Sequence, residues 1–238
     1  MSGASEPFAL RGGIIAAGHG TRLRADGYRV SKPMTPVGGR PLIDHALDRF
    51  RAAGIRRVTV IINEGSEDCR NWLDDHSHDL DLDVIVQTTP SSYASFELVA
   101  ARLAGAPALI TTVDAIMPAD AFRGFVSLAA RFPNDAVVLG LTDHVDDDNP
   151  LWAALDEDGR IPRLGGDRSS HVTAGLYWLP ANQGAAPVRF DRLRDYLRWL
   201  VDEGRPVYGV VLPLVFDVDR AHDVEAAEKA ELRWRESA

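Results

Sequence analysis

The chain has 238 residues, of which 45% are hydrophobic and 26% are charged, and its formal net charge at pH 7 is −9. These values are ordinary for a globular protein with a sizeable core, and the acidic balance argues against nonspecific binding to nucleic acid. The single cysteine, Cys69, excludes an internal disulfide and argues against a cysteine-based metal site. Because the sequence shows neither an apolar run of membrane-spanning length nor a signal-peptide pattern, we expect a cytoplasmic protein that does not associate with membranes.

Strand-like and helix-like segments alternate through the first 142 residues. The apolar, glycine-bounded run 12–18 predicts a buried strand, and the helical spacing of apolar residues at 42–54 predicts a helix that ends at Gly54. This alternation with short connections predicts a three-layer α/β/α fold, Rossmann-like, with a mainly parallel sheet. Further strands are expected at 56–63, 82–88, 107–117 and 135–142, and further helices at 66–76, 92–105 and 120–132.

The pattern changes after residue 142. A β-hairpin is expected at 150–165, around Glu157–Gly159. Strands are then expected at 171–180, 206–213 and 215–218, and helices at 189–204 and 220–235. Since no repeat or linker interrupts the chain, we expect one domain over residues 1–238. Residues 143–238 would form a second wall of a ligand-binding cleft at the carboxyl ends of the strands in the first half, 12–142.

The first strand runs into Gly18-His19-Gly20 and then into a short helical turn. Glycines let the backbone approach a ligand closely, and free backbone N–H groups bind anions, so this segment is typical of a phosphate-binding loop. It is not a Rossmann fingerprint, because Leu23 stands where a third glycine is needed, and it lacks the Gly-Lys-Ser/Thr of a Walker loop. A solvated basic loop is the alternative. The basic residues that follow, against the single acid Asp26, are Arg22, Arg24, Arg29, Lys32 and Arg40.

Lys32 is unusual in this composition. Of the 26 basic residues, 24 are arginine and two are lysine, Lys32 and Lys229. Arginine and lysine are not interchangeable where a compact ammonium must reach a phosphate. We therefore interpret Lys32 as a functional residue, and Lys229 as part of the solvated surface of the C-terminal helix.

Two segments, Ala16–Leu23 and Lys32–Ile43, resemble the signature of the sugar-phosphate nucleotidyltransferase (NTP transferase) family. The family pattern is Ala-Ala-Gly-x-Gly-x-Arg-Leu followed by Lys-Pro-x-x-Pro-Val-x-Gly-x-Pro-Leu-Ile. The resemblance implies the nucleotide-diphospho-sugar transferase fold, with Arg22 at the leaving pyrophosphate and Lys32, on a flexible loop, at the α-phosphate. It also implies that the triphosphate is held by Ala16, Ala17, Gly18, His19, Gly20 and Thr21.

Two carboxylates occupy positions where the family binds Mg²⁺. Asp114 ends an apolar strand, although Val113 replaces the usual preceding glycine, and a helix-capping role is the alternative. Asp217 matches the second position, although Arg220 replaces the family threonine. Asp219 and Asp223 compete for this role, but Asp223 fits better in the first turn of the C-terminal helix. Two carboxylates completed by phosphates and water suit Mg²⁺.

The base and acceptor segments depart further from the family pattern. Gln87 is expected to reach a base edge, with Ser92 and Ser95 where the family has glycines. Gly175 is expected to line the acceptor site. The family's acceptor-phosphate lysine is missing, and Arg163 or Arg168 is expected to replace it, unless both are exposed hairpin arginines.

The expected activity is Mg²⁺-dependent transfer of NMP from an NTP to a sugar 1-phosphate, with release of pyrophosphate, as in nucleotide-sugar biosynthesis. The acceptor phosphate is already anionic, so no general base is needed. One alternative is a CTP-dependent cytidylyltransferase that acts on a small phosphorylated alcohol or phosphonate such as phosphocholine. Another is a non-catalytic nucleotide-binding regulator. The expected partners are the NTP and the acceptor, with no nucleic acid, and the chain is expected to be a monomer or homodimer.

Overall fold

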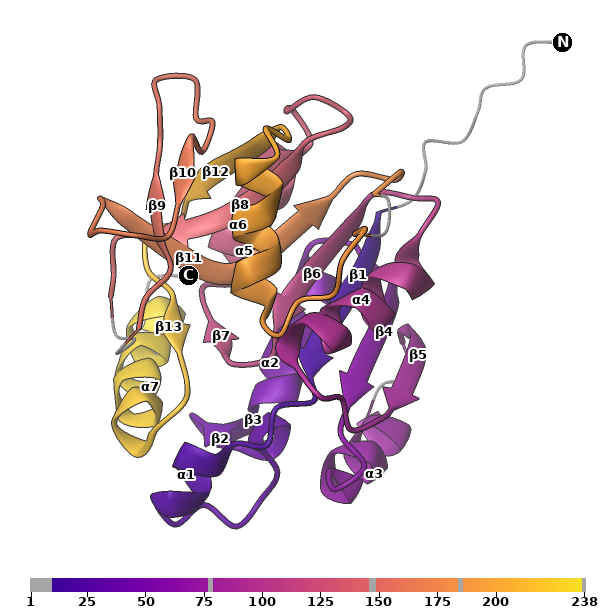
Figure 1. Cartoon of the computed structure of the whole chain (residues 1–238). Helices are drawn as coiled ribbons and strands as arrows, with labels where there is room; N and C mark the ends of the chain where they lie inside the picture. The colour runs from indigo at the N-terminus through magenta and orange to yellow at the C-terminus, as the bar shows by residue number, and fades with distance from the viewer. Residues whose placement is uncertain (1–9, 77–78, 146–148, 184–185, 237–238) are drawn as a thin grey trace, which may run out of the picture.

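The computed structural model describes residues 10–76, 79–145, 149–183 and 186–236. These residues form a nine-stranded sheet with the order β10-β9-β11-β6-β1-β4-β5, and β8 pairs with both β11 and β12 (Figure 1). Pairing is parallel between β1 and its neighbours β4 and β6, between β4 and β5, and between β8 and β12. The strands are β1 (Arg11–Ala16), β4 (Arg57–Ile62), β5 (Asp81–Val86), β6 (Ala108–Thr112), β8 (Val137–Thr142), β9 (Trp152–Ala154), β10 (Arg163–Leu164), β11 (His171–Leu179) and β12 (Val207–Val211).

Helices cover both faces of this sheet, which confirms the three-layer expectation. One hydrophobic core gathers side chains from α4 and α6, and the other gathers side chains from α2, α5 and α7. Figure 1 shows α4 and α6 in front of the sheet, and α7, in yellow, at the lower left of the view next to β13. Within the described parts of the chain, no helix has the length and apolar character needed to cross a membrane. The helices are α1 (Thr21–Ala25), α2 (Leu42–Ala52), α3 (Glu67–His76), α4 (Ser92–Leu103), α5 (Ala119–Ala129), α6 (Leu193–Asp202) and α7 (Ala221–Glu236).

The glycines of β1 explain how helices pack so closely on both faces. Neighbouring strand residues point to opposite faces. A Cβ at Gly12 would lie 2.7 Å from Cε1 of Phe50 on α2, and a Cβ at Gly13 would lie 2.6 Å from Cγ1 of Val99 on α4. The glycine pair therefore lets α2 and α4 approach the central strand and fixes the position of the loop that follows it.

The structure differs from the sequence prediction at one strand. The run 107–117 is broken into β6 and β7 (Ala115–Ile116), because the chain turns away at Asp114 to pair antiparallel with β13 (Phe216–Asp217). The backbone N–H of Val218 donates to the carbonyl of Asp114 at 3.1 Å. This break brings the segment before α7 next to the end of β6, and the candidate site lies there.

The other expected features of the second half are present. The hairpin at 150–165 is formed by β9 and β10, which pair antiparallel. The long strand β11 then runs antiparallel to β6, β8 and β9 in the middle of the sheet. The mixed, mainly parallel sheet expected from the sequence is confirmed. The two remaining short strands, β2 (Pro36–Val37) and β3 (Arg40–Pro41), form a small hairpin after the 3-10 turn η1 (Lys32–Met34).

Candidate active site

The glycine loop leaves the carboxyl end of β1 with a defined shape. The side-chain amide of the buried Asn63 donates to the carbonyls of Ala17 and Gly18, both at 3.3 Å. Gly20 adopts a left-handed conformation, with φ of +60°. Gly18 and His19 are exposed to solvent, so an anionic ligand can reach this loop without a rearrangement of the core. Asn63 was not expected at the site from the sequence, although it follows the buried strand β4 directly.

Lys32 is buried against this loop instead of lying on a flexible segment. Lys32 begins η1 and is 8% exposed. A Cβ added at Gly20 would lie only 2.8 Å from the Cβ of Lys32. Its Nζ lies 2.5 Å from Oδ2 of Asp114 and also hydrogen-bonds Oδ1 of Asp219. Nη1 of Arg22 donates to the other oxygen of Asp219 at 2.9 Å. Two cations from the N-terminal motif and two carboxylates from distant segments therefore form one ion-pair network.

Electrostatics keep this network ionised. Burial alone would lower the pKa of Lys32, but the charges of Asp114, Asp219 and Asp217 outweigh burial, and the pKa is raised well above its usual value. Burial alone would raise the pKa of Asp114. The charge of the neighbouring Lys32 ammonium and the hydrogen bonds to the carboxylate together outweigh burial, so the pKa of Asp114 lies below its usual value. Lys32 is therefore a fixed positive charge over the whole physiological pH range and is not a proton-transfer group.

The contact between Gly20 and Lys32 gives a stability prediction. Gly20→Ala places a side chain in the left-handed region, at about 1–2 kcal/mol, and forces it against the Lys32 stem, at a further ~1–3 kcal/mol. Gly54→Ala is the matched control, because Gly54 has φ of +73° but a Cβ added there would meet no atom within 4 Å. Urea unfolding should show a larger loss for Gly20→Ala than for Gly54→Ala. Equal losses would contradict the close packing of Lys32 on the loop.

The acidic residues come together through the pairing of β7 with β13. Asp217 lies opposite Ala115, and is therefore next to Asp114, and its side chain is exposed. Asp219, two residues further on, forms the ion pairs with Lys32 and Arg22. Because alternate residues of an extended segment point the same way, the Asp-Val-Asp spacing was a signal for a second candidate carboxylate.

Asp223 has a different role, as expected from the sequence. It is buried in the first turn of α7, where its Oδ2 accepts from the backbone N–H groups of Asp219 and Arg220 at 2.9 and 2.7 Å. A carboxylate at the start of a helix satisfies N–H groups that have no partner within the helix. Asp223 thus holds the segment that carries Asp219, and it is not available as a ligand-binding oxygen.

The carboxylates offer the donor set of a divalent-cation site. Oδ1 of Asp114 is buried and has no hydrogen-bond partner among the described residues. Hard oxygen donors of this kind suit Mg²⁺, which usually takes one or two protein carboxylates and completes its shell with phosphates and water. No group of three or more metal-ligating side chains occurs in the part of the chain that the structure describes. Asp114, with Asp217 beside it across the β7–β13 pairing, fits a site that takes two protein carboxylates.

A small cavity of about 150 Å³ opens beside these carboxylates. Gly175 on β11 lines it with φ of +65°, and a Cβ there would lie 2.4 Å from Oγ1 of Thr112. The cavity also brings His144 and Tyr177 to the site, neither of which was expected there from the sequence. Its lining comprises Thr112, Asp114, Ala115, Thr142, His144, Pro150, Leu151, Val172, Thr173, Ala174, Gly175, Tyr177, Val215 and Asp217.

The two arginines expected at the acceptor phosphate do not line this cavity. Arg163 is exposed and donates to the carbonyl of Gly165 at 3.3 Å. The guanidinium carbon of Arg168 lies 5.6 Å from the ring centroid of Trp152. Both side chains thus lie on the hairpin surface in this structure, as the alternative interpretation described.

The residues expected at the base lie at the end of β5 and the start of α4. Gln87 is exposed, and its backbone N–H extends the pairing of β5 with β4. Ser92 is exposed, but its hydroxyl accepts from the backbone of Leu193 at 3.0 Å. Ser95 is buried, and its hydroxyl lies 2.6 Å from that of Thr89. The structure therefore leaves Gln87 open for a ligand, while Ser95 serves the internal structure of the turn.

Comparison with known proteins decides the family. Residues 12–231 match the MobA-like NTP transferase domain. The chain belongs to this family. A segment of 62 residues is 39% identical to the bifunctional protein GlmU of Symbiobacterium thermophilum, covering 26% of this chain and 12% of that protein. A segment of 83 residues is 30% identical to the CMP-5'-(3-aminopropyl)phosphonate synthase of Streptomyces rubellomurinus, covering 35% of this chain and 13% of that protein. The matched segments thus span about an eighth of these relatives.

Solved structures confirm the nucleotide-diphospho-sugar transferase fold. A Bacillus anthracis protein assigned as a glucose-1-phosphate thymidylyltransferase superposes with a TM-score of 0.79 at 17% identity, over 93% of this chain and 95% of that one. The inositol-1-phosphate CTP transferase of T. maritima superposes with a TM-score of 0.75 at 19% identity, over 95% and 98%. The family and fold expected from the two N-terminal motifs are confirmed.

Proposed function

We propose that this protein is a nucleotidyltransferase that transfers NMP from an NTP to a phosphorylated acceptor and releases pyrophosphate. The observation that carries the proposal is the network in which Lys32 and Arg22 meet Asp114 and Asp219. It lies between an exposed glycine loop and the cavity at Gly175. Fixed cations next to paired carboxylates are what phosphoryl transfer needs, because charge develops on the phosphate oxygens.

The residues have separate tasks in this proposal. The glycine loop holds the triphosphate, Arg22 stabilises the leaving pyrophosphate, and Lys32 stabilises the charge on the α-phosphate. An oxygen of the acceptor phosphate attacks the α-phosphorus, and the bond from that phosphorus to the β-phosphate bridge breaks, with the electron pair leaving on pyrophosphate. Asp114 together with Asp217 or Asp219 would hold Mg²⁺, which supplies further charge neutralisation. Residues 12–142 would then serve the nucleotide and 143–238 the acceptor.

A sugar 1-phosphate is the first candidate acceptor, in keeping with the resemblance of Ala16–Leu23 and Lys32–Ile43 to the sugar-phosphate nucleotidyltransferase signature. A small phosphorylated alcohol or phosphonate, with CTP as donor, is the second. The cavity of about 150 Å³ favours this second candidate, because it leaves little room for a bulky acceptor. The similarity to a phosphonate-activating relative supports the same choice.

A substrate screen tests the proposal. Each of the four NTPs is incubated with Mg²⁺ and with pooled sugar 1-phosphates, polyol phosphates, phosphocholine and aminoalkyl phosphonates, and pyrophosphate is measured. We expect pyrophosphate with at least one pair, and none with Asp114→Asn under the same conditions. Binding of an NTP to the wild type without pyrophosphate from any pair would contradict the proposal and favour a non-catalytic nucleotide-binding regulator.

A further inference from the structure

A second hollow lies away from the cavity at Gly175, and the two share no lining residue. It measures about 270 Å³ and lies between α2, the start of α5 and α7. Its wall combines charged side chains of α2 with an apolar surface formed by Met117, Pro118 and Trp234. None of the residues assigned to nucleotidyl transfer contributes to it.

Arg49 on α2 forms part of this wall and is the unusual group in it. The residue is 3% exposed, and its Nε and Nη2 are buried without a hydrogen-bond partner among the described residues. Burial lowers the pKa of Arg49 to about 10, although the nearby charges of Glu231, Asp48 and Asp114 oppose that shift. A buried guanidinium with unused donors is costly, and such groups normally have a carboxylate or an oxyanion as partner.

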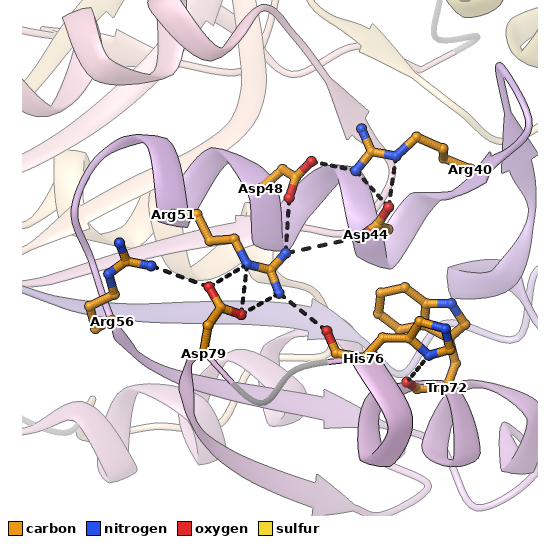
Figure 2. Close-up of polar contacts among 8 residues, drawn as sticks. All are labelled: Arg40, Asp44, Asp48, Arg51, Arg56, Trp72, His76 and Asp79. Atoms are coloured by element: carbon orange, nitrogen blue, oxygen red, sulfur yellow. Dashed lines mark hydrogen bonds and ion pairs between the residues drawn. The ribbon is translucent and has the colours of Figure 1, made fainter.

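The acidic residues of the hollow already have side-chain partners other than Arg49. Figure 2 shows Asp48 between the guanidinium groups of Arg40 and Arg51, and Nη1 of Arg51 lies 2.9 Å from Oδ1 of Asp48. On the other walls, Glu231 of α7 lies 2.9 Å from Nδ1 of His45, and Asp120 of α5 pairs with Arg123. Within the described residues, these pairs leave Nε and Nη2 of Arg49 without a hydrogen-bond partner.

We propose that this hollow binds a small organic oxyanion, with its carboxylate or phosphate on Arg49 and its apolar part against Met117, Pro118 and Trp234. The guanidinium has a planar fork of donors that matches both kinds of oxyanion. The volume of about 270 Å³ leaves room beyond the charged head for a body the size of one ring. The proposal does not depend on the proposed nucleotidyl transfer.

Such a ligand would join the two elements that frame the active site. The polypeptide enters α2 shortly after Lys32, and α7 begins directly after Asp219. An existing contact already ties them, since Oε1 of Glu231 on α7 lies 2.9 Å from Nδ1 of His45 on α2. An oxyanion on Arg49 would therefore add a link between α2 and α7, and the site is suited to an effector that stabilises their arrangement.

Benzoate and its neutral isostere benzamide are the probes, with binding measured by isothermal calorimetry. We expect benzoate to bind the wild type at least tenfold more tightly than benzamide, because only the carboxylate can pair with Arg49. Arg49→Met keeps the stem but removes the donors, so it should weaken benzoate binding at least tenfold. Lys32→Ala, which alters the active-site loop, should leave benzoate binding unchanged. Inorganic phosphate and acetate, titrated in parallel, tell whether the head group is preferred as a phosphate or as a carboxylate.

Thermal unfolding gives a second readout. Without ligand, Arg49→Met should melt at a higher temperature than the wild type, because a buried charge without a partner is removed. Equal binding of benzoate and benzamide to the wild type would overturn the proposal, and so would benzoate binding that Arg49→Met retains or that Lys32→Ala abolishes. A lower melting temperature of Arg49→Met would show that Arg49 stabilises the fold itself, and would also overturn it.

Discussion

Lys32→Ala should lower kcat by about 10²–10³, the range for removing one positioned charge from a transition state. Its Nζ lies 2.5 Å from Asp114, so the alanine variant loses both the cation and the group that holds this carboxylate in place. Nucleotide affinity should fall less, because the glycine loop and Arg22 remain. Steady-state kinetics with the preferred substrate pair, together with NTP binding by calorimetry, separates the two effects.

Lys32→Arg is the sharper version of this experiment. The Lys32 residue is 8% exposed and its stem packs on Gly20, so a wider guanidinium has no room to place its charge at the same point. We expect activity to fall by more than about tenfold. Lys229→Arg is the matched control, since Lys229 lies exposed on α7 and should tolerate the change. Full activity of Lys32→Arg would show that a compact ammonium is not required at this position and would leave Arg22 as the main cation of the loop.

Asp114→Asn should retain the fold and reduce turnover by a factor on the order of 10² or more, because a neutral amide is a poor substitute for a carboxylate beside phosphates and a cation. The effect should persist at saturating Mg²⁺. Asp83→Asn is the control, since Asp83 forms an exposed ion pair with Arg102 on the distant edge of the sheet. Turnover of Asp114→Asn near that of the wild type would contradict the assignment.

Parallel variants decide between the two C-terminal carboxylates. Asp219→Asn should disturb both cations, because Asp219 contacts Arg22 and Lys32, and should raise the KM for NTP as well as lower kcat. Asp217→Asn leaves those contacts in place, so it should act mainly by weakening Mg²⁺ binding, and a higher Mg²⁺ concentration should be needed for half-maximal activity. If Asp217→Asn behaves as the wild type at every Mg²⁺ concentration, Asp219 is the second metal carboxylate and the motif is shifted by two residues.

Local signals were sufficient to predict much of the fold. Apolar runs bounded by glycine and caps mark β1, β4 and α2, and their alternation predicts a sheet covered by helices on both faces. The break at Asp114 was not predictable from the run 107–117, because it depends on pairing with β13 about a hundred residues later. The central place of β11 among three antiparallel neighbours depends on distant pairing in the same way.

The candidate site, like the fold, was predictable from the sequence only where local motifs determine it. The motif residues Arg22 and Lys32 could be named from the sequence, because their spacing is a family signature. The choice of Asp219 as their partner could not, since its contact with Lys32 joins residues 187 positions apart. Arg163 and Arg168 were selected as the basic residues in the segment where the family's acceptor-phosphate lysine is missing, and the structure leaves both side chains outside the cavity at Gly175. Arg49 gave no signal, because an arginine in a helical pattern is normally exposed, whereas here it is 3% exposed and lies beside residues of α5 and α7 that are distant in the sequence.

In the proposed reaction, the α-phosphorus of an NTP is attacked at the cluster formed by Lys32, Arg22, Asp114 and Asp219. ³¹P NMR of the reaction with the preferred substrate pair tests it most directly. We predict equal amounts of free pyrophosphate and of a product in which the nucleoside phosphorus and the acceptor phosphorus are coupled through one bridging oxygen. We also predict that Lys32→Ala slows both signals equally. An NDP with a doubly phosphorylated acceptor, or free NMP without a linked product, would contradict this proposal.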